Sequence, residues 1–353
     1  MESYASSAFV IYQRVKYFYL IATIIIFNSK NSESSMKILV VGAGISGCVC
    51  AHRLAEAGHD VTLVEKGRGV GGRMSTRRMS GARIDHGAQF FTVRDQRMKG
   101  LLEQWQNAGV VVPWYDSIPG RQDLPKAVRY RGINGMTAPA KFLAKSFSFE
   151  KEFFVESVFF DEEWQINEKD GEKRRLFADH LVLTLPVPQM LELFQRSEME
   201  LESKIMDKLE AVRYTRCLAL LGILDRPSLL PFPGTLTHPV PEVEWISDNQ
   251  VKGISELPAC TVHANDEYSK KFWDSPEEGA PFLTKVAEDQ LECKITEWSC
   301  HRWGFAKPLV TFGATQYTSA WERLSLAGDS FGGERIENAA MSGWDAAQAI
   351  LEL

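Results

Sequence analysis

The chain has 353 residues and a formal net charge of −6; 44% of its residues are hydrophobic and 24% are charged. These values are ordinary for a globular protein, and the length suffices for two domains with separate cores. A negative net charge without a basic stripe interleaved with aromatic residues argues against nucleic acid as a partner. The six cysteines form neither a C-x-x-C pair nor a metal-ligand cluster. We therefore expect no metal and a reducing, cytoplasmic location.

Residues 1–35 do not share the pattern of the rest. Tyr17–Phe27 is strongly apolar, but its 11 residues fall short of the ~20 needed to cross a bilayer. Basic residues before it and polar residues after it loosely resemble a signal peptide, without a convincing cleavage site. Met36 stands directly before the first predicted strand. We expect residues 1–35 to be a mis-assigned start or a disordered extension, with a membrane anchor or export signal as the alternative, and no membrane for the folded domain.

A glycine-rich turn follows the first predicted strand, residues 37–41. Gly42 permits a tight turn, Gly44 lets the backbone approach a pyrophosphate, and Gly47 lets the following helix pack closely on the strand. The free N–H groups at the start of that helix favour phosphate. The pattern predicts a dinucleotide site.

An acidic residue closes the next predicted strand, residues 61–64. Glu65 lies about twenty residues past the glycines, where a carboxylate can accept both ribose hydroxyls of an adenosine. An NADP site usually offers an arginine to the 2′-phosphate, so Glu65 argues against NADP. Strand, helix and acid in register favour a nucleotide site over a glycine-rich turn without a ligand.

A second glycine element, Gly71-Gly72-Arg73, resembles the Gly-Gly-Arg loop of the flavoprotein amine-oxidase superfamily. In that superfamily the glycines let a second loop touch the pyrophosphate, and the arginine neutralises part of its charge. The alternative is a basic surface loop, because several arginines lie close together in this stretch: Arg68, Arg73, Arg77, Arg78 and Arg83.

A matching element stands near the C-terminus, where a predicted strand leads into Gly328-Asp329 and Ile336 opens the last helix. In FAD enzymes of this superfamily an aspartate at the position of Asp329 holds the ribityl chain. The N-terminus of the helix faces the flavin pyrimidine ring, where negative charge develops on reduction. The alternative is an ordinary exposed Gly-Asp turn. Elements at both ends of the chain fit one extended FAD better than two small ligands.

The middle of the chain predicts a nucleotide-binding domain interrupted by a second domain. Expected helices cover residues 98–108, 137–145, 200–209 and 276–291, and expected strands cover 153–160, 163–167, 181–185, 216–224, 244–248 and 261–264. Two prolines after residue 185 indicate a sharp exit from the first domain. We assign residues 36–92, 126–195 and 297–353 to a discontinuous FAD-binding domain, and residues 93–125 and 196–296 to a substrate domain with a mixed sheet.

Six motifs together resemble the renalase-type flavoproteins, especially their bacterial branch: KILVVGAGISG, GRGVGGRMSTRR, DHGAQFFTVRD, LTLPVPQ, HRWGFAKP and LAGDSFGGERIENAAMSGWDAA. The resemblance spans about Met36 to Leu353, and DHGAQFFTVRD and HRWGFAKP are its most specific parts. The family often has Lys-Pro-Gly-Arg after a Trp-Ile strand, whereas here Lys252-Gly253 lacks the proline and the arginine. This departure weakens any assignment of substrate contacts in that loop.

The resemblance implies an α/β fold similar to p-hydroxybenzoate hydroxylase, with a Rossmann-type FAD-binding domain and a mixed-sheet α+β substrate domain. FAD is expected to bind non-covalently, since no cysteine follows Cys300 to form a thioether. Renalase-like enzymes oxidise 2- and 6-dihydro-NAD(P) and pass the electrons to O2, giving NAD(P)+ and H2O2. Cofactor contacts are expected from Gly42, Gly44, Ile45, Ser46, Gly47, Glu65, Lys66, Gly72, Arg73, His86, Gly87, Ala88, Gln89, Gly328, Asp329, Ile336, Glu337 and Ala340.

Transfer of hydride from a dihydropyridine needs geometry and a dry face but no obligatory base. This agrees with a sequence without a persuasive catalytic triad, and no catalytic residue is assigned. We expect His86, His263 and His301 near the flavin, where a structural role is equally open. Candidate cavity walls are Trp245, His263, Trp298, Arg302, Trp303 and Phe305. Aromatic rings there could hold a nicotinamide and Arg302 could neutralise a phosphate, although such residues also occur in cores.

Two other functions stay open. The shared cofactor motifs also fit an FAD-dependent amine oxidase, which an acidic pocket or an aromatic pair at the flavin would favour. A non-catalytic accessory flavoprotein is the other alternative, and the presence of Glu65, Arg73 and Asp329 argues only that cofactor binding is retained.

Overall fold

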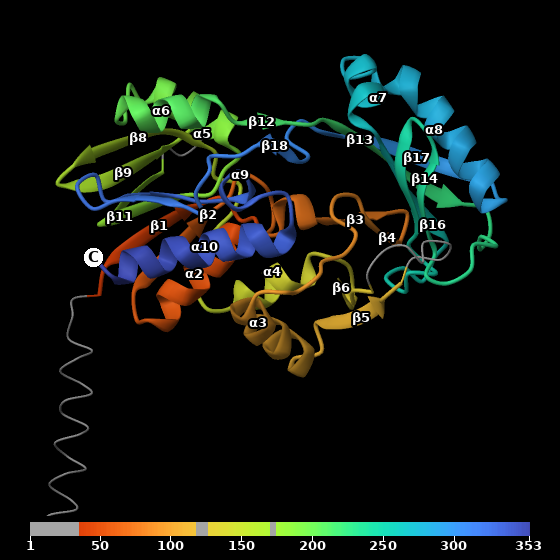
Figure 1. The fold of residues 1–353 in the computed structure, drawn as a ribbon, viewed down its shortest axis with the longest axis horizontal. Coiled ribbons are helices and arrows are strands. Elements are labelled where there is room, and N and C mark those ends of the chain that lie inside the picture. Colours follow the sequence, from red (N-terminus) through yellow and green to blue (C-terminus); the bar gives the residue numbers. More distant parts are fainter. Residues whose placement is uncertain (1–34, 118–125, 170–173) are drawn as a thin grey trace, which may run out of the picture.

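The computed structural model describes residues 35–117, 126–169 and 174–353 (Figure 1). The prediction for the N-terminal extension therefore concerns residues that lie almost wholly outside the described part. Among the described residues, no helix combines the length and the apolar character needed to cross a bilayer.

A six-stranded sheet forms the centre of the nucleotide-binding part, in the order β19-β20-β11-β1-β2-β7. Its strands are β1 (Lys37–Val41), β2 (Asp60–Val64), β7 (Ser148–Glu150), β11 (His180–Leu183), β19 (Tyr317–Ser319) and β20 (Leu324–Leu326). All neighbouring pairs are parallel except β19 with β20. In β1, Ile38 and Val40 enter one core while Leu39 and Val41 enter another. This explains why the strand is continuously apolar.

Helices and a smaller sheet cover the two faces. One face carries α2 (Ile45–Glu56), α3 (Gln96–Asn107), α4 (Ala138–Leu143) and α10 (Ile336–Leu351). The other face carries the sheet β10-β9-β8, with helices α5 (Val187–Arg196) and α6 (Ser203–Glu210) beyond it. The strands of this sheet are β8 (Val155–Asp161), β9 (Glu163–Glu168) and β10 (Arg175–Ala178).

A five-stranded antiparallel sheet, here called the substrate sheet, has the order β14-β15-β16-β13-β17. Its strands are β13 (Cys217–Leu224), β14 (Thr235–Val240), β15 (Val243–Asp248), β16 (Ala259–Ala264) and β17 (Ile295–Trp303). Helices α7 (Asp266–Lys271) and α8 (Pro276–Leu291) lie on its outer side (Figure 1). The helices bury Leu218 and Leu220 of β13, so this face of the sheet is apolar.

Short two-stranded ribbons connect the two parts. They are β3 (Thr76–Met79) with β4 (Ala82–Asp85), β5 (Val111–Tyr115) with β6 (Arg129–Gly132), and β12 (Arg213–Tyr214) with β18 (Pro308–Val310). The inner face of the substrate sheet packs on β4, where Ile84 meets Leu221 and Ala259. The inner face therefore looks toward the nucleotide-binding part.

The predicted α/β fold class is confirmed, and the helix predicted over residues 276–291 matches α8. Three details differ. The prolines after residue 185 begin α5 rather than an exit from the domain, because proline suits the first turn of a helix. Strand β17 was not predicted, and it joins the substrate sheet across the proposed boundary at residue 297. Helix α3, assigned to the substrate domain, packs in the core of the first sheet. With these changes the two-domain division stays a proposal.

Candidate functional site

The three glycines of the turn between β1 and α2 differ in the space around them. Gly42 has φ +106°, and an added Cβ would lie 2.8 Å from Thr184 Oγ1. A Cβ on Gly47 would lie 2.0 Å from the Gly42 carbonyl oxygen, so α2 could not approach the strand. A Cβ on Gly44 would meet nothing within 4 Å. Two glycines thus serve the fold, whereas Gly44 leaves the backbone open toward a ligand.

The start of α2 offers unused hydrogen-bonding groups beside Gly44. The helix begins at Ile45 without a capping side chain and without an acid in its first turn. Ser46 is buried, and its Oγ has no partner among the described residues. A buried hydroxyl and free helix amides next to an open backbone fit a phosphate group.

Glu65 is held against the glycine turn by two backbone donors. Its Oε2 accepts from Ala43 N at 2.9 Å, and its Oε1 accepts from Gly67 N at 2.8 Å. Each oxygen keeps a further lone pair, which suits the two hydroxyls of a ribose. The neighbouring Lys66 is exposed.

The Gly-Gly-Arg loop meets the glycine turn directly. Gly72 has φ +50°, and a Cβ there would lie 3.3 Å from Gly44 Cα. Arg73 forms an ion pair with Asp329, 256 residues away, with Nη2 to Oδ1 at 2.7 Å and a second bond from Nη1 to Oδ2. Burial opposes the charge of Arg73, but the Asp329 carboxylate outweighs it and raises the pKa of the guanidinium. The elements from the two ends of the chain therefore meet at one place.

Phe305 and Tyr214 complete this junction. The Phe305 carbonyl accepts from Arg73 Nη1 at 2.9 Å, and its ring contacts the Tyr214 ring edge-on with centroids 5.5 Å apart. Burial, followed by the charge of Asp329, raises the pKa of Tyr214 to about 12, so the phenol keeps its proton. Gly328 precedes Asp329 with φ +145°, a conformation that favours glycine.

The residues present fit FAD. We call the open backbone at Gly44, the free amides of α2, Glu65, and the Arg73–Asp329 pair the flavin cradle. The first two would hold the pyrophosphate, Glu65 the adenosine ribose, and the ion pair the region where pyrophosphate and ribityl chain join.

The side chains at the start of α10 are engaged within the protein. Glu337 is buried, and its carboxylate accepts from the backbone N–H of Arg94 and of Asp95, the latter at 2.7 Å. Ile336 packs against the first core and Ala340 lies within it. The side chains of these three residues are therefore not free to bind the cofactor. Any contact from this part of the chain would come from the backbone amides at the start of α10, which has no capping side chain.

The loop from Asp85 to Gln89 joins the Gly-Gly-Arg loop to the substrate sheet. Ala88 N donates to the Arg73 carbonyl at 2.8 Å, and a Cβ on Gly87 would lie 2.0 Å from that same oxygen. On the other side, the His86 carbonyl accepts from Trp303 Nε1 at 2.9 Å and pairs with His263 Nε2 at 3.1 Å.

An aromatic row crosses the inner face of the substrate sheet. Trp245 pairs with His263, His263 pairs with Ala219, and Ala219 pairs with His301. Residues paired across strands share a face, and every second residue along a strand returns to it. Trp303 therefore lies on this face as well.

The His86 ring extends the row from the opposite side. It stacks on Trp303 with centroids 5.1 Å apart and meets His301 edge-on at 5.0 Å. The structure thus brings together four of the residues predicted near the flavin, which come from two distant parts of the sequence: His86, His263, His301 and Trp303.

Trp298 and Arg302 do not join this row. Arg302 pairs with Leu218, which lies in the core under α8, and Arg302 Nη1 donates to the Trp273 carbonyl at 3.1 Å. Trp298 has the same parity in β17 and also faces outward. The expectation of a single cavity wall that includes these two residues needs correction, because neighbours along a strand alternate between faces.

Burial favours the neutral form of all three histidines of the row. Burial, with help from His301, lowers the pKa of His86 to about 3, and burial lowers the pKa of His263 to about 4. The pKa of His301 is also lowered, chiefly by burial. Within the described ranges no carboxylate forms an ion pair with any of the three. The row is therefore an uncharged, largely aromatic surface at neutral pH.

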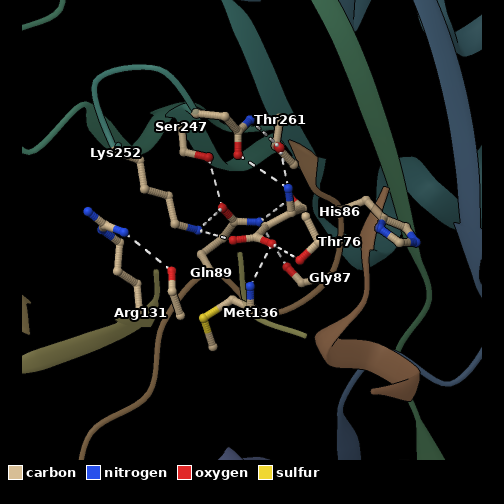
Figure 2. Close-up of polar contacts among 12 residues, drawn as sticks. Thr76, His86, Gly87, Gln89, Arg131, Met136, Ser247, Lys252 and Thr261 are labelled. Carbon is tan, nitrogen blue, oxygen red and sulfur yellow. Dashed lines mark hydrogen bonds and ion pairs between the residues drawn. The ribbon is translucent and has the colours of Figure 1, made fainter. Parts of the chain in front are cut away.

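A buried ion pair that was not predicted supports this surface from behind. Lys252 is 1% exposed, and its Nζ donates to Asp85 Oδ2 at 2.8 Å and to Gln89 Oε1 at 3.2 Å. Figure 2 shows the Lys252 side chain directed at Gln89, with Ser247 bonded to the same amide oxygen at 2.9 Å. Burial lowers the pKa of Lys252, and the Asp85 carboxylate opposes this change.

Asp85 is satisfied from three directions. Its Oδ1 accepts from Thr76 Oγ1 at 2.6 Å and from Met136 N at 2.8 Å, and its carbonyl accepts from Thr261 Oγ1 at 2.8 Å (Figure 2). The pair therefore locks the Asp85–Gln89 loop between the β3–β4 ribbon and the substrate sheet. The only sequence signal was Lys252 in the loop that departs from the family pattern, and nothing local pointed to its partner.

Comparison with known proteins agrees with this geometry. The NAD(P)-binding Rossmann-like domain family matches residues 40–105. Renalase of Mus musculus is 26% identical over 296 residues, covering 77% of this chain and 85% of that protein. A 4,4'-diapophytoene desaturase of Staphylococcus aureus is 43% identical over 60 residues, which cover 17% of this chain and 12% of the enzyme.

Solved structures show the same fold over nearly the whole chain. Cyclohexylamine oxidase from Brevibacterium oxydans superposes with a TM-score of 0.67 and 16% identity, covering 90% of this chain and 99% of that one. A putrescine oxidase bound to putrescine gives a TM-score of 0.65 and 14% identity with the same coverage. The chain is thus similar to renalase over 77% of its length and shares the fold of these two amine oxidases over 90% of it. Together with the cradle, these similarities identify an FAD-dependent oxidoreductase.

Proposed function

We propose that this protein is an oxidase of isomeric dihydronicotinamide dinucleotides, the 2- and 6-dihydro forms of NAD(P). Bound FAD would supply the redox chemistry, with hydride acceptance at N5 and transfer of two electrons to O2, and the products would be NAD(P)+ and H2O2. The similarity to renalase supports this choice. The observation that carries it is the neutral aromatic row on the inner face of the substrate sheet.

The row suits a flat, uncharged hydride donor. His86 and His263 stay unprotonated at neutral pH, because burial lowers the pKa of His86 to about 3 and that of His263 to about 4. A dihydropyridine needs no base, since aromatisation drives the loss of hydride. The rings would hold the nicotinamide parallel to the flavin and keep water away.

Amine oxidation is the second candidate, because two of the structural neighbours are named for amines. An amine site needs room between aromatic rings or an acidic group for the ammonium ion. The His86 and Trp303 rings are stacked on each other at 5.1 Å, which leaves no space for a substrate between them. Asp85, the carboxylate just behind the row, is already paired with Lys252. Both observations favour the dinucleotide.

Anaerobic mixing tests the proposal. The FAD-loaded protein is combined separately with 2-dihydro-NAD, 6-dihydro-NAD, ordinary 4-dihydro-NAD, putrescine and cyclohexylamine, while the absorbance of oxidised flavin is followed. We expect rapid bleaching with the two isomers, and one H2O2 for each NAD+ when oxygen is admitted. The ordinary 4-dihydro form is the matched control for non-specific reduction. Bleaching by an amine alone would assign the protein to the amine oxidases, and bleaching by nothing would make it an accessory flavoprotein.

A cytoplasmic location of the protein is part of the same proposal. All six cysteines are free thiols, including Cys48 and Cys50 on α2, which are buried and point to different sides of the helix. A reducing compartment such as the cytoplasm suits this chemistry.

A further inference from the structure

A hollow of about 280 Å³ opens between the β3–β4 ribbon and α4, apart from the flavin cradle. It shares no lining residue with the cradle. We call it the cationic groove, because four basic side chains line it together with Asn134 and Phe142: Arg78, Arg83, Lys141 and Lys145.

The four basic side chains of the groove have no carboxylate partner in the described part of the chain. Among the described residues, none of Arg78, Arg83, Lys141 and Lys145 forms an ion pair, and the polar contact of Arg83 is a 3.4 Å bond to Asn134 Oδ1. Such a gathering is unexpected in a chain of net charge −6, in which acids outnumber bases by 46 to 40. Arg97, for comparison, pairs with two aspartates.

The backbone places two of these cations in a repulsive pair. Arg78 stands directly opposite Arg83 in the β3–β4 ribbon, an arrangement that destabilises an antiparallel pair when no counter-charge is near. Lys141 lies in the last turn of α4 and Lys145 lies two residues past its end, so two further cations border the hollow without a counter-charge among its described lining residues. Both pairs line the same hollow. A ligand with more than one negative charge would supply a counter-charge to both pairs at once.

The remaining wall of the groove is apolar. Val110, Ile133 and Phe142 line it, and Ile133 is 42% exposed although it is a large hydrophobic residue. A bare phosphate would leave this wall unused, whereas a nucleobase would cover it. Small-molecule sites have volumes of roughly 300–1,000 Å³, so this hollow is close to the lower end of that range. It is too small to enclose a dinucleotide.

We propose that the cationic groove is a second nucleotide site, which binds a nucleoside diphosphate with its base against Ile133 and Phe142 and its phosphates among the four cations. The Arg78 and Arg83 fork geometry suits phosphate oxygens. This site is independent of the oxidase reaction proposed above.

Calorimetric titration of the full-length, FAD-loaded protein with ADP tests the site. We expect saturable binding that weakens as salt is raised, with flavin absorbance showing that FAD stays in place. The double variant Arg78→Gln/Lys141→Gln takes one cation from each pair and should weaken ADP about tenfold or more. A matched variant, Lys204→Gln/Lys271→Gln, removes two exposed charges elsewhere and should leave the affinity unchanged.

Two further probes separate the nucleoside from the phosphates. Inorganic pyrophosphate should bind more weakly than ADP because it leaves the apolar wall exposed, and AMP should bind more weakly because it carries less charge. Absence of saturable ADP binding, or equal loss in both double variants, would overturn the proposal. Pyrophosphate binding as tightly as ADP would overturn the assignment of a nucleoside.

Discussion

The flavin cradle and the aromatic row differ in how they are built. The glycine turn of the cradle depends on backbone shape: Gly42, Gly44 and Gly47 lie within six residues, where Gly42 and Gly47 have no room for a Cβ and Gly44 leaves the backbone open. The aromatic row depends on side chains from strands far apart in the sequence, which only the register of the substrate sheet brings to one face. The glycine turn is therefore a local element that approaches the cofactor, whereas strand register over a long range controls what the cofactor can meet.

Substitutions of the cradle glycines should have the largest effect. In Gly47→Ala the new Cβ would lie 2.0 Å from the Gly42 carbonyl, so we expect loss of both folding stability and FAD retention. In Gly44→Ala the methyl group points into open space, so the protein should unfold at nearly the same denaturant concentration yet retain FAD poorly. Denaturation and the ratio of flavin to protein absorbance measure the two effects. Equal retention of FAD in Gly44→Ala would break the assignment of this backbone to the pyrophosphate.

Breaking the buried Lys252–Asp85 ion pair should have the second largest effect. Lys252→Met leaves the Asp85 carboxylate buried without its ammonium partner, which costs about 3–5 kcal/mol of unfolding free energy. Urea denaturation measures the loss. The double variant Lys252→Met/Asp85→Asn should recover part of it, because the uncompensated charge is gone. Additive losses would show that the two residues do not act as a pair.

Acidification should weaken the fold through the buried histidines. Burial lowers the pKa from 6.5 to about 3 for His86 and to about 4 for His263 and His180. The unfolded chain therefore takes up these protons first, so stability is complete above about pH 6.5 and falls as the pH drops toward 4. Each histidine contributes up to about 1.4 kcal/mol per pH unit. His263→Gln should show a shallower decline than the parent protein in urea denaturation at each pH, and an unchanged slope would contradict a neutral buried His263.

Substitutions on the two faces of β17 should have the smallest effects, and these effects should differ between the inner and the outer face. Trp303→Phe removes the bond from Nε1 to the His86 carbonyl, 2.9 Å long, and should cost about 0.5–1.5 kcal/mol together with slower flavin reduction in rapid mixing. Arg302→Gln, one residue away but on the outer face, should leave the rate of flavin reduction unchanged. A similar slowing in both variants would mean that the inner face has no special part in the reaction.

The sequence-based predictions succeeded where a feature depends on residues close together in the chain, and they failed where it depends on residues far apart. The cradle was predictable because the turn, the helix start and Glu65 are set by backbone conformation over about thirty residues. Helix α8 was predictable from its start at Pro276 and its periodicity. Strand β17 was missed, and with it the alternation that separates Trp298 and Arg302 from His301 and Trp303.

By itself, the sequence determined the nucleotide turn and the acid that follows it, because these depend on neighbours along the chain. The choice of flavin came from the resemblance of the Gly-Gly-Arg loop and of Asp329 to a known superfamily. The tertiary structure alone decided that Arg73 meets Asp329 across 256 residues, that Lys252 is buried against Asp85, and which side of β17 faces the flavin domain. The physical reason is that burial and strand register are properties of the packed whole. A lysine in a loop or an arginine in a strand carries no local mark of which surface will cover it.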